Sequence, residues 1–355
     1  MTPLDVRAEV ERIARLLDIE PARVTYLESA PAADLRKLRN QLSDILYDGD
    51  SASLRRVAAG AKFLPAPLAA SIGQHVFGAL LCARVAGVLE VGRAVELAQR
   101  VPPEFLAEIA RHMDPRRANV VIGRLPTDRV VHAAAALAKR RDFVAMAAFV
   151  EHLSDDAILA AAPLLDDETL LRIAFYVESR KRLEELLTLL GDERVAGMVR
   201  AAHEHSLWPD ALELVGNLGP KRRRHIAALA AAESDEVLSG IARAATEHGL
   251  FERLLPLVAA MGEDELRRFA KLSAVQAKAT LTGIVRAAAA QEDLWPALVP
   301  LVPSLPAKAQ RHVEAVAAEI GPEHAARLRE GSDPLEGGRC ARGQVREGSD
   351  PLEGG

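Results

Sequence analysis

The sequence predicts an all-α fold, a right-handed α-solenoid of short stacked antiparallel helices, and three observations support this. The 355 residues are 49% hydrophobic but only 4% aromatic, and they are dominated by small and unbranched residues that lose little side-chain freedom in helices. No sustained alternation of β-branched, aromatic and polar residues marks a strand. The third observation is internal repetition at a period typical of helical repeat proteins.

The repetition is clearest between residues 191 and 326. A glycine followed by a short apolar run recurs 43 residues apart, at Gly197, Gly240 and Gly283. An aromatic side chain recurs at the turn into the second helix, and a polar ring or amide side chain recurs at the end of the first helix. We therefore predict three helical repeats over 191–326, with the aromatics packed between repeats and the polar residues at helix ends. These positions are Trp208, Phe251 and Trp295, and His205, His248 and Gln291.

A shorter rhythm fills residues 63–190. An apolar residue followed by Pro, Ser or Asp recurs about every dozen residues, as at Val101-Pro102, Leu125-Pro126 and Leu153-Ser154. Pro, Ser and Asp are residues that begin helices. A helix of about ten residues is about 15 Å long and is marginal alone, so these helices must stack.

Segments with this rhythm resemble the cytosolic N-terminal superhelical domain of MgtE-type magnesium transporters. The resembling stretches are 100–106, 125–130 and 153–159, and that domain is also a run of short helices with such junctions. The resemblance implies the architecture alone, since the chain shows no regulatory domain pair and no membrane-spanning segment after the helices. It does not imply magnesium transport or the family's ion-sensing residues.

Two terminal segments flank these helices. Residues 1–62 are expected to form an N-terminal helical cap, including an amphipathic helix over 33–47 that places Leu35, Leu38, Leu42, Ile45 and Leu46 on one face. Residues 327–355 are rich in Gly, Asp, Glu and Pro and are expected to be disordered. The tail contains REGSDPLEGG twice, at 329–338 and 346–355.

Composition and charge favour a cytoplasmic protein that is not inserted in a membrane. Residues 1–17 lack the apolar core of a secretory signal, and Cys82 and Cys340 are not expected to form a disulfide. The apolar stretch Ala66–Val91 is interrupted by charged residues, so it is expected to be a packed helix pair. A net charge of −5 and a pI near 6.1 disfavour nucleic acid as a partner. The Ala- and Arg-rich composition suggests a bacterial source.

Catalytic and metal-binding motifs give no support for an enzyme, a cofactor or a metal. No serine lies in a nucleophile elbow, no phosphate-binding loop follows a strand, and no cysteines and histidines have zinc-ligand spacing. Carboxylate clusters are expected to cap helix starts, and divalent-cation binding is the alternative. These clusters are Asp155-Asp156, Asp166-Asp167-Glu168, Asp192-Glu193 and Glu263-Asp264-Glu265.

One basic cluster is the best candidate for partner binding on the folded body. Four positive charges at a predicted helix start oppose the helix dipole rather than complement it. They suggest a surface for an acidic protein or a phosphate-bearing ligand, and a solvated charge run is the alternative. The predicted residues are Lys221, Arg222, Arg223 and Arg224, with Arg267, Arg268 and Lys271 from the next repeat.

The duplicated tail is a second candidate, as a bivalent docking peptide, and an incidental duplication is its alternative. Its predicted contact residues are Asp333, Pro334, Leu335 and Glu336, and Asp350, Pro351, Leu352 and Glu353. Together these features predict a non-enzymatic scaffold or adaptor that binds another protein through the solenoid surface, with the duplicated tail as a second candidate contact. The alternative function is a ligand- or Mg²⁺-sensing regulatory module.

Overall fold

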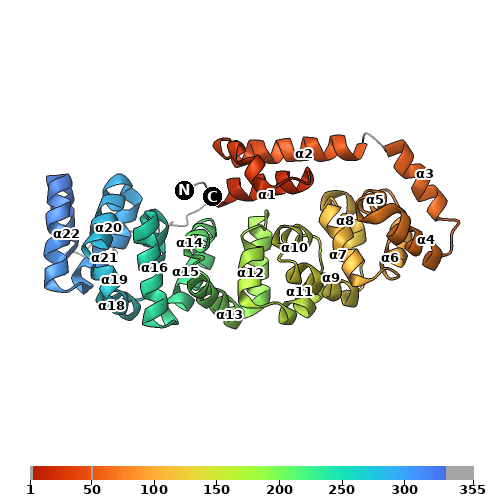
Figure 1. Cartoon of the computed structure of the whole chain (residues 1–355). Helices are drawn as coiled ribbons and strands as arrows, with labels where there is room; N and C mark the ends of the chain where they lie inside the picture. Colours follow the sequence, from red (N-terminus) through yellow and green to blue (C-terminus); the bar gives the residue numbers. More distant parts are fainter. Residues whose placement is uncertain (1–2, 49–50, 333–355) are drawn as a thin grey trace, which may run out of the picture. The chain divides into compact units, whose positions relative to one another are not determined.

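A computed structural model describes residues 3–48 and 51–332 (Figure 1). Every element of regular secondary structure in these residues is a helix, so the predicted all-α class is confirmed. Contacts between residues divide the chain into two compact units, Met1–Ile241 and Ala242–Gly355. The boundary lies within α16 (Asp235–His248), inside the stretch predicted to hold three repeats.

Unit 1 begins with α1 (Leu4–Leu16) and α2 (Ala32–Asp48), which run in the same direction because the 3-10 turns η1 (Pro21–Arg23) and η2 (Thr25–Ser29) return the chain along α1. We call this two-helix unit the hairpin. Val6, Val10 and Ile13 of α1 pack with Leu35 of α2, which confirms the predicted amphipathic helix. Ile45 is an exception, since it is exposed. The physical reason is length, because α2 has 17 residues and α1 has 13, and the last turn of α2 extends past its partner.

Short helices follow the hairpin, as the rhythm of junctions predicts. They are α3 (Ser51–Ala61), α4 (Ala66–Ile72), η3 (Gly73–Phe77), α5 (Gly78–Ala86), α6 (Val91–Ala98), α7 (Pro103–His112), α8 (Pro115–Ile122), α9 (Thr127–Lys139), α10 (Phe143–Val150), α11 (Asp155–Ala161), η4 (Ala162–Leu164) and α12 (Asp167–Ala174). Each helix contacts the next but one along the chain. One row contains α3, α5, α7, α9 and α11, and the other contains α4, α6, α8, α10 and α12. The apolar faces of these helices are therefore buried between neighbours of the same and the opposite row.

Junction residues begin these helices in the way that the sequence predicts. The side chains of Asp114, Asp142, Ser154 and Asp166 each accept a hydrogen bond from a backbone N–H in the first turn of the helix that follows. Each such bond satisfies a donor that the helix itself leaves without a partner. The spacing of these caps therefore sets the lengths of the helices.

The apolar stretch Ala66–Ala86 departs from the expectation of a packed helix pair. It forms α4, η3 and α5, and the chain bends at Gly78, whose φ of 74° favours glycine. By length and composition it is the one helical stretch among the described residues that could cross a membrane. Its inner face packs on the rest of unit 1, but most of the stretch is not buried.

The remaining helices carry the 43-residue repeats. Unit 1 continues with α13 (Arg180–Glu204), α14 (Trp208–Gly216), α15 (Pro220–Ala232) and the first part of α16, and α13 is broken at Gly191, where φ is 78°. Unit 2 contains the end of α16 and then α17 (Phe251–Val258), α18 (Glu263–Lys271), α19 (Ser273–Gln276), α20 (Lys278–Ala290), η5 (Glu292–Leu294), α21 (Trp295–Leu301), η6 (Val302–Ser304), α22 (Ala307–Ile320) and α23 (Pro322–Ser332). The recurring aromatics Trp208, Phe251 and Trp295 are buried, which confirms that they pack. His205, His248 and Gln291 lie at helix C-terminal ends, as expected.

The three repeat glycines share a steric role. A methyl group placed on Gly197, Gly240 or Gly283 would lie 1.9 to 2.4 Å from a side chain of a preceding helix or helix start. These side chains are Asp167, His203 and Phe251 respectively. The glycines are therefore required for close helix approach rather than for an unusual backbone conformation.

Replacing Gly283 with alanine should lower the free energy of unfolding by about 1 to 3 kcal/mol, because the buried Phe251 ring must move to admit the methyl group. The matched control is Gly60→Ala in α3, where no atom lies within 4 Å of the added carbon. That change should be neutral or stabilise the helix by up to about 1 kcal/mol. Urea denaturation of both variants measures the difference, and equal effects would contradict the steric role.

Candidate functional site: the surface beneath the N-terminal hairpin

Helix α1 lies against α10 and α14 of unit 1 and meets a line of carboxylates there (Figure 1). We call Asp142, Glu178 and Asp210 the acidic row. Asp142 is the N-cap of α10, Glu178 immediately precedes α13, and Asp210 lies in the first turn of α14. The chain of α1 runs antiparallel to this row, so that each carboxylate meets a different arginine. The ion pairs are Arg7–Asp210, Arg12–Glu178 and Arg15–Asp142.

Asp142 both caps α10 and binds the hairpin. Its Oδ1 accepts a hydrogen bond from the Ala145 backbone N–H at 3.2 Å, which caps α10. Arg15 donates to both carboxylate oxygens, with Nη2 2.9 Å from Oδ2, and Arg111 Nε donates to Oδ2 at 2.9 Å. Such two-pronged contacts between Arg and a carboxylate fix geometry as well as charge. Burial raises the pKa of Asp142, but Arg15 and the cap outweigh it, so that the pKa lies below its usual value.

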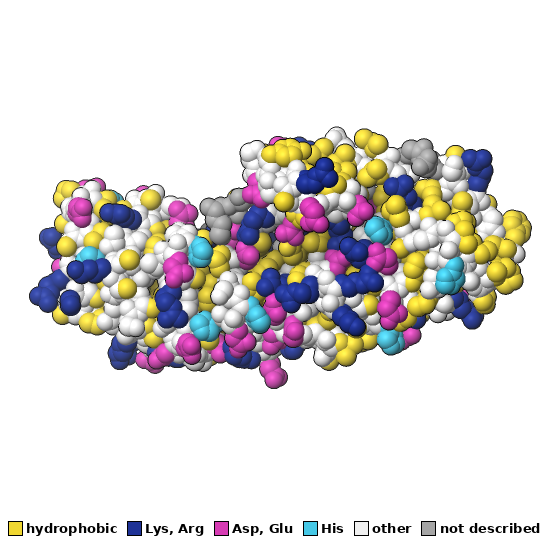
Figure 2. All heavy atoms as spheres, in the orientation of Figure 1, with side chains coloured by type: hydrophobic (Ala, Val, Ile, Leu, Met, Phe, Trp, Pro, Cys, Tyr) yellow, Lys and Arg dark blue, Asp and Glu magenta, His cyan; other side chains and the backbone are white. Residues whose placement is uncertain are grey.

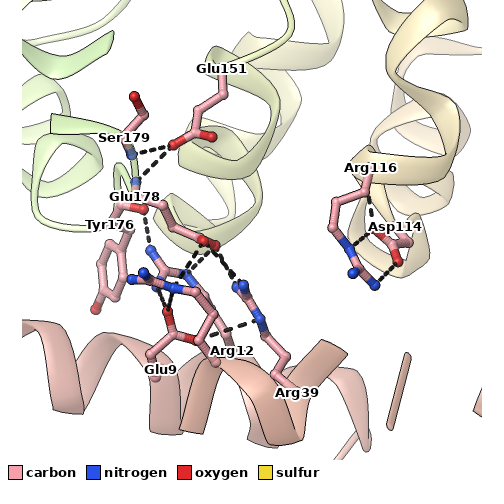
Figure 3. Close-up of polar contacts among 10 residues, drawn as sticks. Glu9, Arg12, Arg39, Asp114, Arg116, Glu151, Tyr176, Glu178 and Ser179 are labelled. Carbon is pink, nitrogen blue, oxygen red and sulfur yellow. Dashed lines mark hydrogen bonds and ion pairs between the residues drawn. The ribbon is translucent and has the colours of Figure 1, made fainter. Parts of the chain in front are cut away.

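Glu178 belongs to a partly buried network of charges, in which its own side chain is 29% exposed (Figure 3). Glu9 of α1 is fully buried and Arg12 is 8% exposed. Arg12 Nη1 donates to Glu9 Oε1 at 2.8 Å, and its Nε lies 3.5 Å from Glu178 Oε1. Arg39 of α2 donates to both oxygens of Glu178, with Nη2 3.1 Å from Oε2. Arg36 Nε donates to Glu9 Oε1 at 3.1 Å. Two carboxylates therefore share three guanidinium groups from the hairpin.

Burial affects the pKa values of both the arginines and the carboxylates in this network. Desolvation lowers the pKa of Arg12 below its usual value, and the neighbouring Glu178 and Glu9 oppose that change. Desolvation also acts to raise the pKa of Glu178, but Arg39, Arg12 and Arg36 outweigh it and the pKa falls. Glu151 Oε1 accepts hydrogen bonds from the backbone N–H groups of Glu178 and Ser179 at 2.9 and 2.7 Å. The turn that presents Glu178 is thus held in place.

Both ends of the hairpin are also anchored. At the start of α1, the Leu4 backbone N–H donates to Glu213 Oε1 at 2.7 Å, and Glu213 is buried. Near the end of α2, the Tyr47 hydroxyl donates to the His112 carbonyl at 2.7 Å and accepts from the Asp114 N–H at 2.9 Å. Ser43 Oγ donates to Asp114 Oδ2 at 2.6 Å. The hairpin is therefore attached along its length mainly through polar contacts.

The described residues also bear on metal binding and on catalysis. Within 3–48 and 51–332, no group of three or more His, Cys, Asp and Glu side chains is arranged to hold a metal ion. An apolar cavity of about 240 Å³ lies inside unit 1, and its lining contains no charged, hydroxyl or amide side chain. Cys82 lies at this cavity, and burial raises the pKa of its thiol to about 11. Such a thiol is a poor nucleophile at neutral pH.

No family model, curated protein or solved structure matches the chain. The resemblance to the MgtE-type N-terminal domain therefore stays a prediction, and function is argued from the residues alone.

The predicted basic cluster is divided between the two units. Lys221 to Arg224 lie at the start of α15 in unit 1, and Arg267, Arg268 and Lys271 lie on α18 in unit 2. Arg223 Nη2 donates to the carbonyls of Gly216 and Leu218 at 3.1 Å. It thereby satisfies acceptors at the end of the preceding helix, which accounts for a positive charge at this helix start.

The other members of the cluster differ in their surroundings. Arg222 donates to the Glu184 carbonyl and to Thr188, whereas Lys221 and Arg224 are exposed. Arg267 pairs with Glu263 and Asp264 within α18. The predicted tail contacts, 333–336 and 350–353, lie outside the described residues.

The carboxylate clusters lie at helix starts, as the capping interpretation predicts. Asp166 accepts from the Thr169 N–H at 2.7 Å, and Glu265 accepts from the Gly262 N–H at 2.7 Å. Asp155 lies in the first turn of α11 and also binds Arg182 at 2.9 Å. These carboxylates are thus engaged in local structure.

Sequence reasoning missed the docking of the hairpin. Its contacts join residues 65 to 209 positions apart, and a carboxylate at a helix start is already explained as a cap. One signal was present, since Glu9 shares a helix face with Val6 and Ile13, three residues before it and four after it. A glutamate on the apolar face of a helix indicates a buried charge that requires a partner.

Replacing Glu178 with glutamine should destabilise unit 1 by about 1 to 3 kcal/mol, because Arg12 and Arg39 lose a counter-charge in a network that is only partly buried. Hydrogen exchange at the α1 amides and urea denaturation measure the loss. The exposed Glu193→Gln in α13 is the matched control and should change stability by less than about 0.5 kcal/mol. Similar losses in the two variants would contradict the role of the network.

The stability that Asp142 and Glu178 contribute should depend on pH. Because the pKa values of Asp142 and Glu178 are lowered in the folded chain, the folded state binds fewer protons than the unfolded state. Their contribution is therefore complete near pH 7 and is lost as the pH falls through the lowered values, below about pH 4. The stability difference between wild type and Glu178→Gln should shrink between pH 5 and pH 3. A difference that stays constant over this range would show that these carboxylates are not the source.

Proposed function

We propose that this chain is a non-enzymatic cytoplasmic scaffold or adaptor, whose rows of helices form a right-handed solenoid and bind helical segments of other proteins. The observation that supports this proposal is the docked hairpin. The acidic row of unit 1 holds α1 through three arginines, one to each carboxylate. Helix α1 has no net charge, since Asp5, Glu9 and Glu11 balance its three arginines. A surface that pairs with three arginines of such a helix has the chemistry to pair with basic residues on one face of a partner's helix.

The apolar and the basic side chains of α1 contact different parts of unit 1, which supports a contact that a partner's helix could replace. The apolar side chains Val6, Val10 and Ile13 pack chiefly within the hairpin, against Leu35 of α2. The arginines face the acidic row. The contact beneath α1 is therefore rich in charge pairs, and charge complementarity of this kind gives specificity and rapid association more than raw affinity. The partner class that fits is a helical segment with two or three basic residues on one face.

Two predicted surfaces extend the proposal. Lys221 and Arg224 remain exposed at the start of α15 and could contact an acidic partner, and the duplicated tail could serve as a docking peptide. The alternative function, a ligand- or Mg²⁺-sensing module, is suggested by the MgtE-like stretch and by carboxylate clusters that lie at the starts of helices. No observation in the described residues favours it over protein binding.

A crosslinked pull-down from native lysate tests the proposal. Wild type is compared with Arg7→Ala/Arg15→Ala, which should loosen the hairpin and expose the acidic row, and capture of polypeptides should rise several-fold. Adding Asp142→Arg and Asp210→Arg to that variant is the control and should abolish the gain, because the row would then repel basic helices.

Two further variants show whether a partner binds at the tail or at α15. Loss of a captured protein from a chain ending at Leu328 would assign it to the tail, and loss from Lys221→Glu/Arg224→Glu would assign it to α15. Capture that no variant changes, or no capture above an unrelated protein of similar charge, would contradict the scaffold proposal.

A further inference from the structure

The helices α3 to α5 of unit 1 expose an unusual number of large hydrophobic side chains. Of the thirteen such side chains that are exposed in the described residues, six fall within residues 63–88. Figure 2 shows hydrophobic side chains gathered over this part of unit 1, with basic side chains beside them. We call this surface the apolar end. It consists of Phe63, Leu68, Val76, Phe77, Leu80 and Val88.

These side chains are not needed for the packing of their own helices. α3 packs on α5 through Leu54, Ala58 and Val85. α4 packs through Ala70 on a cluster that includes Val101 and Leu106. Each helix has therefore already buried one apolar face, and the side chains of the apolar end are exposed in addition, although Phe77 also lines the internal cavity. Exposed apolar side chains gathered on one part of a surface, as in Figure 2, indicate an interaction site.

The charge of this segment restricts what can cover it. Residues 51–89 contain Arg55, Arg56, Lys62 and Arg84 but no Asp or Glu, in a chain whose net charge is −5, and one exposed carboxylate, Glu90, follows directly. Arg55, Arg56 and Lys62 are exposed. The occupant should therefore present negative charge at its margin and accept apolar side chains inside it. An anionic lipid surface has both properties over a wide area.

The structure disfavours two other occupants. A second copy bound about a two-fold axis would bring this surface against itself, and its basic residues would face each other without an acidic partner from the same segment. The chain's own tail carries one large apolar residue in each copy, Leu335 and Leu352, which is too few to cover six side chains.

A membrane-spanning arrangement is also disfavoured, although Ala66–Ala86 is long and apolar enough for one. The chain bends at Gly78, and Ala70, Ala83 and Val85 are buried against the rest of unit 1. Spanning would remove these contacts, whereas binding flat at the headgroup boundary would keep them.

We propose that the apolar end of unit 1 binds the surface of anionic membranes, with its hydrophobic side chains in the headgroup boundary and Arg55, Arg56 and Lys62 against acidic headgroups. This peripheral binding goes beyond the protein-binding function and does not depend on it. The acidic row and the apolar end use different residues, so that one scaffold could hold a partner while attached to a lipid surface.

The test is co-sedimentation of the full chain with vesicles of phosphatidylcholine alone or of phosphatidylcholine with phosphatidylserine. Wild type should bind the anionic vesicles, and high salt should weaken that binding. Phe63→Ser/Val76→Ser should lower the partition coefficient at least tenfold, since these side chains are 89% and 72% exposed and their loss leaves the core intact. Arg55→Glu/Arg56→Glu should remove the preference for anionic vesicles.

Ile45→Ser is the matched control, because Ile45 is 70% exposed but lies on α2, outside the apolar end. It should bind vesicles as wild type does, and circular dichroism should show the same helix content in every variant. Four outcomes would overturn the proposal: no binding to either vesicle, equal loss in the control, binding that resists alkaline carbonate as a spanning helix does, or a dimer in solution that Phe63→Ser/Val76→Ser dissociates.

Discussion

A helix of eight or ten residues cannot bury enough surface to be stable by itself, and this limit determines how unit 1 is built. Helix α10, for example, contacts α8 and α12 of its own row and α9 of the other row, so that its apolar side chains are covered from more than one side. The junctions are consequently frequent, and each one needs polar side chains to satisfy the free backbone groups of a helix start. A large supply of ordered carboxylates at helix starts follows directly from the shortness of the helices.

The hairpin binds to carboxylates at these helix starts. Asp142 caps α10 and binds Arg15 with the same carboxylate, and Glu178 is held by a turn that Glu151 fixes. A binding surface has thus been assembled from groups that the fold already requires. It follows that the attachment of α1 and the stability of these junctions are linked, and changes at these carboxylates alter both.

Local pattern and repetition were enough to predict the helices, their junctions, the caps and the packing of Trp208, Phe251 and Trp295. Each of these depends on residues close in sequence or on a repeat that makes distant equivalence visible. Docking of α1 depends on pairs such as Arg7 and Asp210, which no local pattern connects. Exposure was also misjudged, at Ile45 and along Ala66–Ala86, because periodicity identifies an apolar face but not whether a neighbour is long enough to cover it.

The repeat glycines have a consequence for how such a chain can change in length. Gly197, Gly240 and Gly283 occupy one repeat position, yet each lies beneath a different neighbour, a carboxylate, an imidazole and a phenyl ring. Deleting or adding one 43-residue period would preserve the glycine while giving it a neighbour of another size and polarity. The copies are therefore not interchangeable modules, and evolution of this chain by gain or loss of single repeats would demand a compensating substitution at each new joint.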